Sequence, residues 1–207
     1  MSEAAEKGLA LGGLRRAAVV AVVVLAVLGL LAILGWRVAA SEARKNVTVA
    51  WNGAVTCEGT TVEPTSRGEG RGEAPVIRLR EGMRCSLPVR VTNEGRFDVK
   101  VTRVRLPFMG PEANAAVQVT TLEGQPWHRP ESTDAVFRLQ EWVEPGDTYD
   151  FVVELEFRAP PGGCSSPGRM LWVGDMPKVT VRALGRPGVR SSEEPLGFRG
   201  TRESTCG

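Results

Sequence analysis

The sequence predicts an all-β sandwich with Greek-key connections that follows one N-terminal transmembrane helix. Three observations indicate this fold class. Residues 17–36 form an uncharged apolar run. Apolar residues after residue 40 recur with a period of two and show no sustained helical period. Roughly eight to nine short strand signals fit into about 140 residues. This spacing favours a sandwich over a barrel or a propeller, and the length suffices for one hydrophobic core.

The apolar run reads AAVVAVVVLAVLGLLAILGW. As a helix that rises about 1.5 Å per residue, it spans roughly 30 Å, the thickness of a hydrocarbon core. We therefore expect a cytoplasmic segment at 1–16, a transmembrane helix at 17–36 and a juxtamembrane linker at 37–46. A cleaved signal peptide is the alternative, because two arginines precede the run and Val38-Ala39-Ala40 resembles a cleavage site. The run exceeds the roughly 7 to 15 apolar residues of a signal peptide, which favours the anchor.

The cysteines indicate the orientation of this helix. The basic residues do not indicate an orientation, because equal numbers flank the apolar run. Three precede it (Lys7, Arg15 and Arg16) and three follow it (Arg37, Arg44 and Lys45). All four cysteines follow the run, and disulfides persist in oxidising compartments. We therefore expect a single-pass protein of the cell membrane, with a cytoplasmic N-terminus and residues 41–207 on the extracytoplasmic side.

The charges of the outer segment balance. Of 26 basic and 24 acidic residues, four basic and two acidic ones lie in residues 1–40, which leaves 22 of each beyond them. A balanced segment lacks the basic stripe that nucleic acid requires, so we expect no nucleic-acid partner. The preference for Arg over Lys, together with abundant Ala, Val and Gly, is typical of a GC-rich bacterium.

The first strand signal lies at 47–57, where apolar residues share odd positions. A charged, glycine-rich loop at 64–74 follows, and then a short strand at 76–80. Residues 85–91 and 97–101 alternate in the manner of a hairpin closed at Asn93-Glu94-Gly95. After Val101 the apolar phase shifts by one residue, which predicts a β-bulge at Thr102–Arg103.

Further strands are expected at 115–122, 134–142, 148–157, 170–173 and 178–184. The strand at 148–157 alternates most cleanly, which indicates one buried face and one solvated face. Glu144-Pro145-Gly146-Asp147 leads into it with Pro and Gly at the positions that a type II turn requires. The sandwich domain is thus predicted at 47–184. Residues 185–207 lack alternation and are expected to form an extended tail.

Strand parity suggests which cysteines pair. Cys57 and Cys85 each continue the apolar phase of their strand, so both side chains are expected to point inward and to form a disulfide. By elimination, Cys164 would tether the tail through Cys206. An intermolecular bridge from Cys206 is the alternative, since four cysteines permit three connectivities.

The sequence offers no catalytic or metal-binding set. His128 is the only histidine, and the methionines show no repeated ligand spacing, so we expect no metal and no cofactor. Neither a nucleophile elbow nor a phosphate-binding loop occurs. A triad would have to use His128 with Glu131, Ser132 or Asp134, all within one loop. We therefore expect a protein that is not an enzyme.

Two stretches carry a family resemblance. LPVRVTNEGRFDVKVTRVRL at 87–106 and VEPGDTYDFVVELEF at 143–157 resemble the pattern of bacterial immunoglobulin-like domains of the CARDB and related fibronectin-like type. The matching positions are Val91, Asn93, Gly95, Pro145, Gly146 and Asp147. The resemblance implies an immunoglobulin-like fold used outside the membrane for spacing and adhesion, and it transfers no binding residues.

These features predict a non-enzymatic binding or accessory protein of the bacterial cell envelope. Its expected partners are the membrane and another envelope protein. The candidate contacts are apolar loop residues, namely Phe108, Met109, Trp127 and Trp172, although such residues also serve as lids over a sandwich. A second hypothesis is a ligand- or metal-binding protein that uses the loop at 127–134, and a third is a structural spacer.

Overall fold

The structure, a computed structural model, describes residues 3–67, 72–128, 131–158 and 166–204. The helix α1 (Glu3–Lys45) precedes an all-β part. From Ala18 onward this helix is long and apolar enough to cross a membrane, with a mean hydropathy of 3.1 over its most apolar window. The expected linker at 37–46 is helical as far as Lys45. The chain divides into two compact units, residues 1–41 and residues 42–207.

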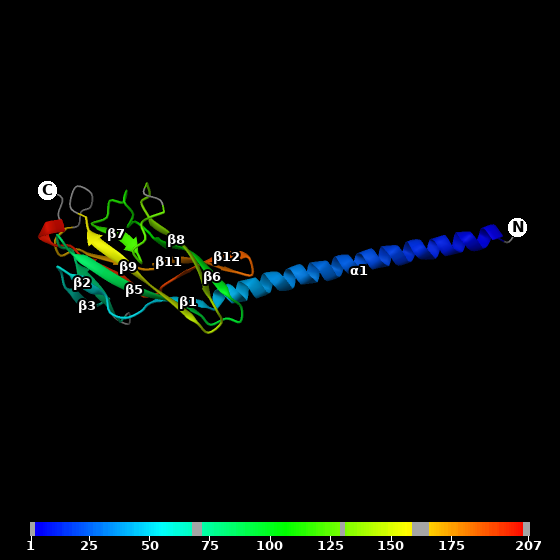
Figure 1. The fold of residues 1–207 in the computed structure, drawn as a ribbon, viewed down its shortest axis with the longest axis horizontal. Coiled ribbons are helices and arrows are strands. Elements are labelled where there is room, and N and C mark those ends of the chain that lie inside the picture. The colour runs from blue at the N-terminus through cyan, green and yellow to red at the C-terminus, as the bar shows by residue number, and fades with distance from the viewer. Residues whose placement is uncertain (1–2, 68–71, 129–130, 159–165, 205–207) are drawn as a thin grey trace. The chain divides into compact units, whose positions relative to one another are not determined.

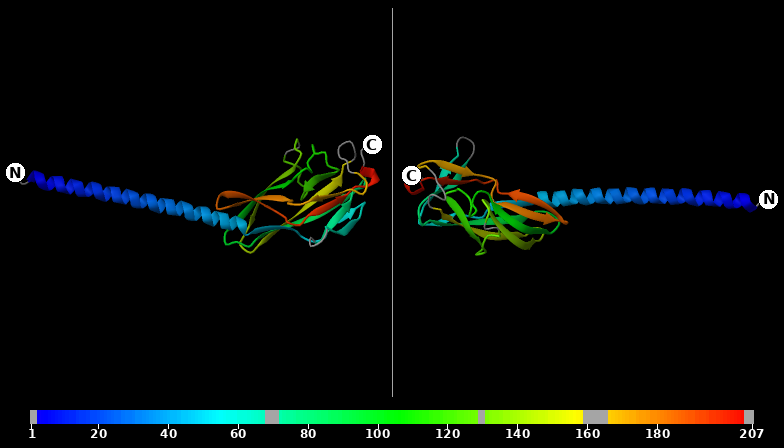
Figure 2. Two further views of the ribbon diagram at one scale, coloured as in Figure 1. Left: turned by 180° about the vertical axis from the view of Figure 1, so that it is seen from behind. Right: turned by 90° about the horizontal axis from the view of Figure 1, so that it is seen from above.

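The all-β unit consists of three sheets, which Figures 1 and 2 show from three sides. In spatial order, sheet A contains β1 (Val47–Trp51), β5 (Arg84–Asn93), β9 (Thr148–Phe157) and β7 (Val117–Leu122), with β2 (Thr56–Glu58) paired to β5. Sheet B contains β10 (Met170–Val173), β13 (Leu196–Arg199), β4 (Glu73–Arg78) and β3 (Val62–Ser66). Sheet C contains β12 (Arg186–Ser191), β11 (Lys178–Ala183), β6 (Val99–Leu106) and β8 (Ala135–Val143). A short 3-10 helix, η1 (Arg202–Ser204), follows β13.

One hydrophobic core joins the sheets. In β5, buried and half-buried residues alternate along most of the strand, as the period-two pattern predicts. Leu87 and Val89 of sheet A, Val104 and Val181 of sheet C, and Ile77 of sheet B are all fully buried in the same cluster. The all-β sandwich preceded by one apolar helix is therefore confirmed.

The expected hairpin at Asn93-Glu94-Gly95 is wrong. β5 and β6 belong to different sheets, because β5 pairs with β1, β2 and β9 whereas β6 pairs with β8 and β11. The connection is an arch from sheet A to sheet C. Asn93, which is fully buried, holds it: its Nδ2 donates to the carbonyls of Phe97 (3.0 Å) and Val143 (2.9 Å), and its Oδ1 accepts from the amide of Gly95 (3.0 Å).

Two local predictions are confirmed. The pairing of β6 with β8 shifts register between Val101 and Arg103, where the phase change predicts a bulge. In the turn that follows β8, the Asp147 amide donates to the Glu144 carbonyl (3.1 Å), and Gly146 has a φ of 85°. This positive φ at the third position is the signature of a type II turn.

The segment at 185–207 is not an extended tail. Residues 186–191 form β12, an edge strand that pairs with β11 in a hairpin, seen in orange in Figure 2. Residues 196–199 form β13, which runs parallel to β4 and buries Leu196 and Phe198. The glycine-rich loop expected at 64–74 is also shorter than predicted, since β3 reaches Ser66 and β4 begins at Glu73.

The structure contains a disulfide between Cys57 and Cys85, the pair that strand parity indicates. The two residues lie directly opposite each other on β2 and β5. The Cys85 side chain is buried and that of Cys57 is half-buried. Cys164 and Cys206, for which a second bridge is expected, lie outside the described residues.

Candidate interaction surfaces

An open cleft of about 940 Å³ lies between β10 and the loop that connects β6 to β7. Its described lining is mostly apolar and includes Phe108, Met109, Leu171, Trp172 and Phe198. The sequence predicts Phe108, Met109 and Trp172 as separate contact candidates, and the structure brings these three together. An open cleft with this lining can accept an apolar side chain of a partner.

Phe108 is the most exposed of these side chains, with 71% of its surface accessible. Its φ of 59° places the backbone in the left-handed region, which is a genuine outlier for a bulky aromatic residue. The carboxylate of Asp134 holds this conformation, because its Oδ1 accepts from the Phe108 amide at 3.0 Å. The Oδ2 of Asp134 forms an ion pair with the Nε of Arg105 at 2.6 Å. The strained residue is therefore fixed in place and presents its ring to solvent.

Hydrogen bonds and close packing also fix the residues that follow Phe108 in the loop between β6 and β7. Gly110 lies so close to the 132–134 segment that a Cβ there would collide with the Ser132 carbonyl. The Gly110 amide donates to the Thr133 carbonyl at 3.0 Å. The guanidinium of Arg158, the residue after β9, donates to the carbonyls of Gly110 (2.8 Å) and Ala113. Burial lowers the pKa of Arg158, while the charges of nearby glutamates oppose that shift.

The other three contact candidates are less accessible than expected. Met109 is only 3% exposed and forms part of the core, so its expected exposure is wrong. Trp127 is half-buried, and its Nε1 donates to the Val119 carbonyl at 2.7 Å, as a lid over the sandwich does. Trp172 is half-buried over Gly197 of β13, where a Cβ would lie 2.8 Å from the ring.

The loop at 127–134 forms hydrogen bonds with the loop between β6 and β7 and so helps to hold it in place. The His128 amide donates to the Val136 carbonyl at 2.8 Å, and the Ser132 carbonyl accepts from the Glu112 amide at 3.2 Å. Arg129 and Pro130 lie outside the described residues. Within the part of the chain that the structure describes, no group of three or more His, Cys, Asp or Glu side chains could hold a metal ion.

The pKa of one tyrosine is strongly shifted. Burial of Tyr149 raises the pKa of its hydroxyl, and a hydrogen bond of 3.0 Å to the Glu123 carboxylate raises it further. The Tyr149 ring also packs against Phe151, with 5.8 Å between centroids. A hydroxyl that stays protonated and is engaged by a carboxylate is a structural feature of sheet A.

Comparison with known proteins identifies no family. No family model and no curated protein sequence matches the chain. Among solved structures, a structural-genomics target is 9% identical with a TM-score of 0.35, covering 75% of this chain and 87% of the other. The Pseudomonas fluorescens alkylpurine DNA glycosylase AlkC, bound to DNA containing an abasic-site analogue, is 15% identical with a TM-score of 0.31, covering 74% of this chain but only 30% of the glycosylase. A PapD-like domain of human CEP192 is 13% identical with a TM-score of 0.29, covering 70% and 84%. Scores this low carry no functional argument.

Proposed function

We propose that this chain is a non-enzymatic, membrane-anchored protein of the bacterial cell envelope, which binds another envelope protein through an immunoglobulin-like domain outside the membrane. α1 supplies the anchor, with its N-terminus in the cytoplasm. The disulfide between Cys57 and Cys85 supports the extracytoplasmic location, because such bonds persist in oxidising compartments.

The observation that carries the binding function is the backbone of Phe108. A left-handed conformation costs a bulky residue about 1–3 kcal/mol and persists only where the surroundings enforce it. Asp134 enforces it here, and the result is an aromatic ring that is 71% exposed at the rim of an apolar cleft. A residue selected for stability alone would be Gly, or would turn its ring inward. An exposed aromatic anchor in a rigid loop is typical of a protein-binding site.

Site-specific photocrosslinking in intact cells tests this function. A photoreactive phenylalanine analogue at position 108 is expected to give a discrete adduct of higher mass that remains with the membrane after a carbonate wash. The matched control carries the same analogue at Val152, which is 38% exposed on sheet A. Two outcomes would contradict the proposal: identical adducts from positions 108 and 152, or an adduct that the carbonate wash releases from the membrane.

The substitution Phe108→Gly separates binding from folding. Glycine adopts a φ of 59° without strain, so the variant is expected to be as stable as the wild type, or more stable by about 1 kcal/mol. Its partner should no longer copurify from detergent extracts. If the partner still copurified with the variant, Phe108 would not be part of the binding site.

A further inference from the structure

Sheet C carries six basic residues on its outer face. They lie on three neighbouring strands and point away from the core, since they alternate with fully buried residues such as Val104 and Val179. The six are Lys100, Arg103 and Arg105 on β6, Arg138 on β8, and Lys178 and Arg182 on β11. Charge that balances along the sequence is therefore segregated in space.

The registers of these strands place like charges directly opposite one another. Lys100 faces Arg182 and Arg105 faces Lys178 across the β6–β11 pairing, and Arg103 faces Arg138 across the β6–β8 pairing. Like charges at opposed positions destabilise a sheet. Within the described residues, Arg105 has an ion pair, with Asp134, and no other ion pair involves these six side chains. The arrangement thus works against folding.

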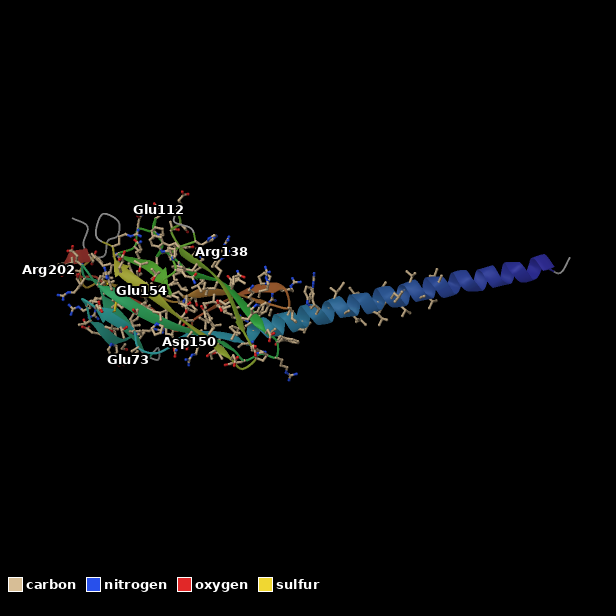
Figure 3. The ribbon with its side chains drawn as sticks, viewed as in Figure 1. Glu73, Glu112, Arg138, Asp150, Glu154 and Arg202 are labelled. Carbon is tan, nitrogen blue, oxygen red and sulfur yellow. A yellow bond between two sulfur atoms is a disulfide. The ribbon has the colours of Figure 1, made fainter. Side chains whose placement is uncertain are left out.

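Sheet A provides an internal comparison. On its outer face Arg84 lies opposite Glu156 on β9 and Glu58 on β2, and Arg90 lies opposite Asp150. The last pair forms two hydrogen bonds of 2.7 Å. Figure 3 labels Arg138 of β8 and, below it in this view, Asp150 and Glu154 of β9. Sheet A therefore places opposite charges across from each other, whereas sheet C places like charges across from each other. An unpaired basic surface of this kind is expected where an anionic partner supplies the negative charge.

The same face carries an exposed tryptophan. Trp142 on β8 is 63% exposed and lies opposite Lys100, whose Nζ is 5.4 Å from the ring centroid. Exposed tryptophan beside basic side chains is typical of surfaces that bind lipid headgroups.

Trp142, Lys100 and Arg182 lie side by side on β8, β6 and β11. This row is close to Arg44, near the start of the second compact unit. Arg182 lies opposite both Lys100 and Pro187, and the Pro187 carbonyl accepts from the Nη1 of Arg44 at 2.6 Å. Arg44, at the end of α1, belongs to the same compact unit. The aromatic end of the basic face therefore lies, within this unit, beside the strand that contacts Arg44.

We propose that the outer face of sheet C binds the anionic phospholipid headgroups of a membrane. The inference rests on the proposed anchor, since a tethered domain meets headgroups at high effective concentration. The basic residues form a grid, with neighbouring strands about 4.8 Å apart and outward residues about 6.7 Å apart along each strand. A planar array of charge matches a planar bilayer, whereas a single polyanionic chain would contact one row of it. Four of the six cations are arginines, whose planar guanidinium groups suit phosphate oxygens.

Vesicle flotation tests the proposal. The full chain, inserted in nanodiscs of zwitterionic phosphatidylcholine, is mixed with vesicles of phosphatidylcholine alone or with roughly 30% phosphatidylglycerol, whose anionic headgroups give the vesicle a negative surface potential. We expect flotation with the anionic vesicles only, and its loss as salt is raised from about 20 to about 500 mM. Flotation equal with both vesicle types would overturn the proposal.

Matched double variants locate the binding face. Arg103→Gln with Arg138→Gln should lower vesicle binding roughly tenfold or more, while stability is unchanged or higher because an opposed like-charge pair is removed. Arg84→Gln with Arg90→Gln changes the net charge equally on sheet A, and should leave binding within about twofold while lowering stability slightly. Equal loss of binding in both variants would show that net charge alone acts, which overturns the assignment to sheet C.

A further arm replaces vesicles with soluble polyphosphate at equal phosphate concentration. Binding to polyphosphate without binding to anionic vesicles would identify a linear polyanion as the partner and overturn the lipid assignment. The vesicle assay does not depend on the anchor in the cell. If the N-terminal segment were found to be cleaved, the proposed anchor would fail while flotation would still report on the basic face.

Discussion

At the scale of single residues, Asp134 joins two features that the sequence separates. Its carboxylate binds the amide of Phe108, 26 positions earlier in the chain, and the side chain of Arg105 on β6. From the sequence, Asp134 is only one polar residue of a loop, considered as a member of a triad around His128. No local pattern shows that a carboxylate stabilises a distant residue in a left-handed conformation. The exposure of Phe108 could be predicted, but its rigid presentation could not.

The ion pair of Arg90 with Asp150 makes stability depend on pH. Hydrogen bonding to Arg90 lowers the pKa of the Asp150 carboxyl below its ordinary value of 3.8. The pair therefore stabilises the fold fully above that value, and the contribution disappears as the pH falls through the lowered pKa. Both side chains are nearly half exposed, so the effect is small.

Arg90→Gln is thus expected to lower the melting temperature at pH 7 by at most a few degrees and to lower it by less near pH 2. Arg96→Gln, at an exposed arginine of the arch, serves as the control. Thermal denaturation followed by circular dichroism at the two pH values measures the difference. An Arg90→Gln variant with the same deficit at both pH values would show that the pair does not act through the charge of Asp150.

At the scale of secondary-structure elements, the arch between β5 and β6 depends on one amide side chain. Asn93→Ala removes the two donors to Phe97 and Val143 and the acceptor for Gly95. Because unsatisfied buried polar groups cost about 1–3 kcal/mol each, we expect the free energy of unfolding to fall by about 3 kcal/mol. Urea denaturation measures this, with Thr92→Ala as the neighbouring control. A loss below about 0.5 kcal/mol would mean that the arch is held by its backbone alone.

The strand β13 is expected to be essential to the core. Phe198 is 2% exposed within it, and truncation of a buried Phe costs about 3–5 kcal/mol. Phe198→Ala should lose that amount, whereas Val189→Ala, at a residue 58% exposed on β12, should lose less than about 0.5 kcal/mol. If chemical denaturation showed equally small losses for both variants, β13 would not be part of the core, and residues 185–207 would behave as the extended tail that the sequence predicts.

Alternation predicts which residues form strands but not which strands pair. The period of two identifies β5, β6 and β9, and the phase shift in β6 locates the bulge, because both signals are local. Whether the Asn93 turn closes a hairpin or crosses between sheets is decided by partners elsewhere in the chain. β12 contains Pro187 and Gly188, which weaken any local strand signal, and it forms through pairing with β11.

At the scale of the whole molecule, the charges show what composition conceals. The outer segment carries 22 basic and 22 acidic residues, yet three strands gather six of the basic ones on one face. Only the registers of β6, β8 and β11 bring these residues together. Linear composition therefore supports a statement about net charge and none about surface patches.

The location of the domain determines whether its disulfide forms. The bond between Cys57 and Cys85 closes a loop with a sequence separation of 28. On the loop-entropy model it contributes about 3–4 kcal/mol, although the mechanism is model-dependent. Neither cysteine is expected to react with maleimide in spheroplasts until a reductant is added, and Cys57→Ala with Cys85→Ala should lower the free energy of unfolding by about that amount. Reaction before reduction would place the domain in a reducing compartment.

The boundary between the two compact units follows Ser41. The main cluster of buried apolar residues begins at Ala43, and the contacts of Arg44 with Pro187 and Arg190 lie within the second unit. Proteolysis at Val38-Ala39-Ala40 would therefore remove the apolar segment and leave these packing partners together. A chain cut there would lose the proposed anchor and keep both of the proposed binding surfaces, which lie in the second unit.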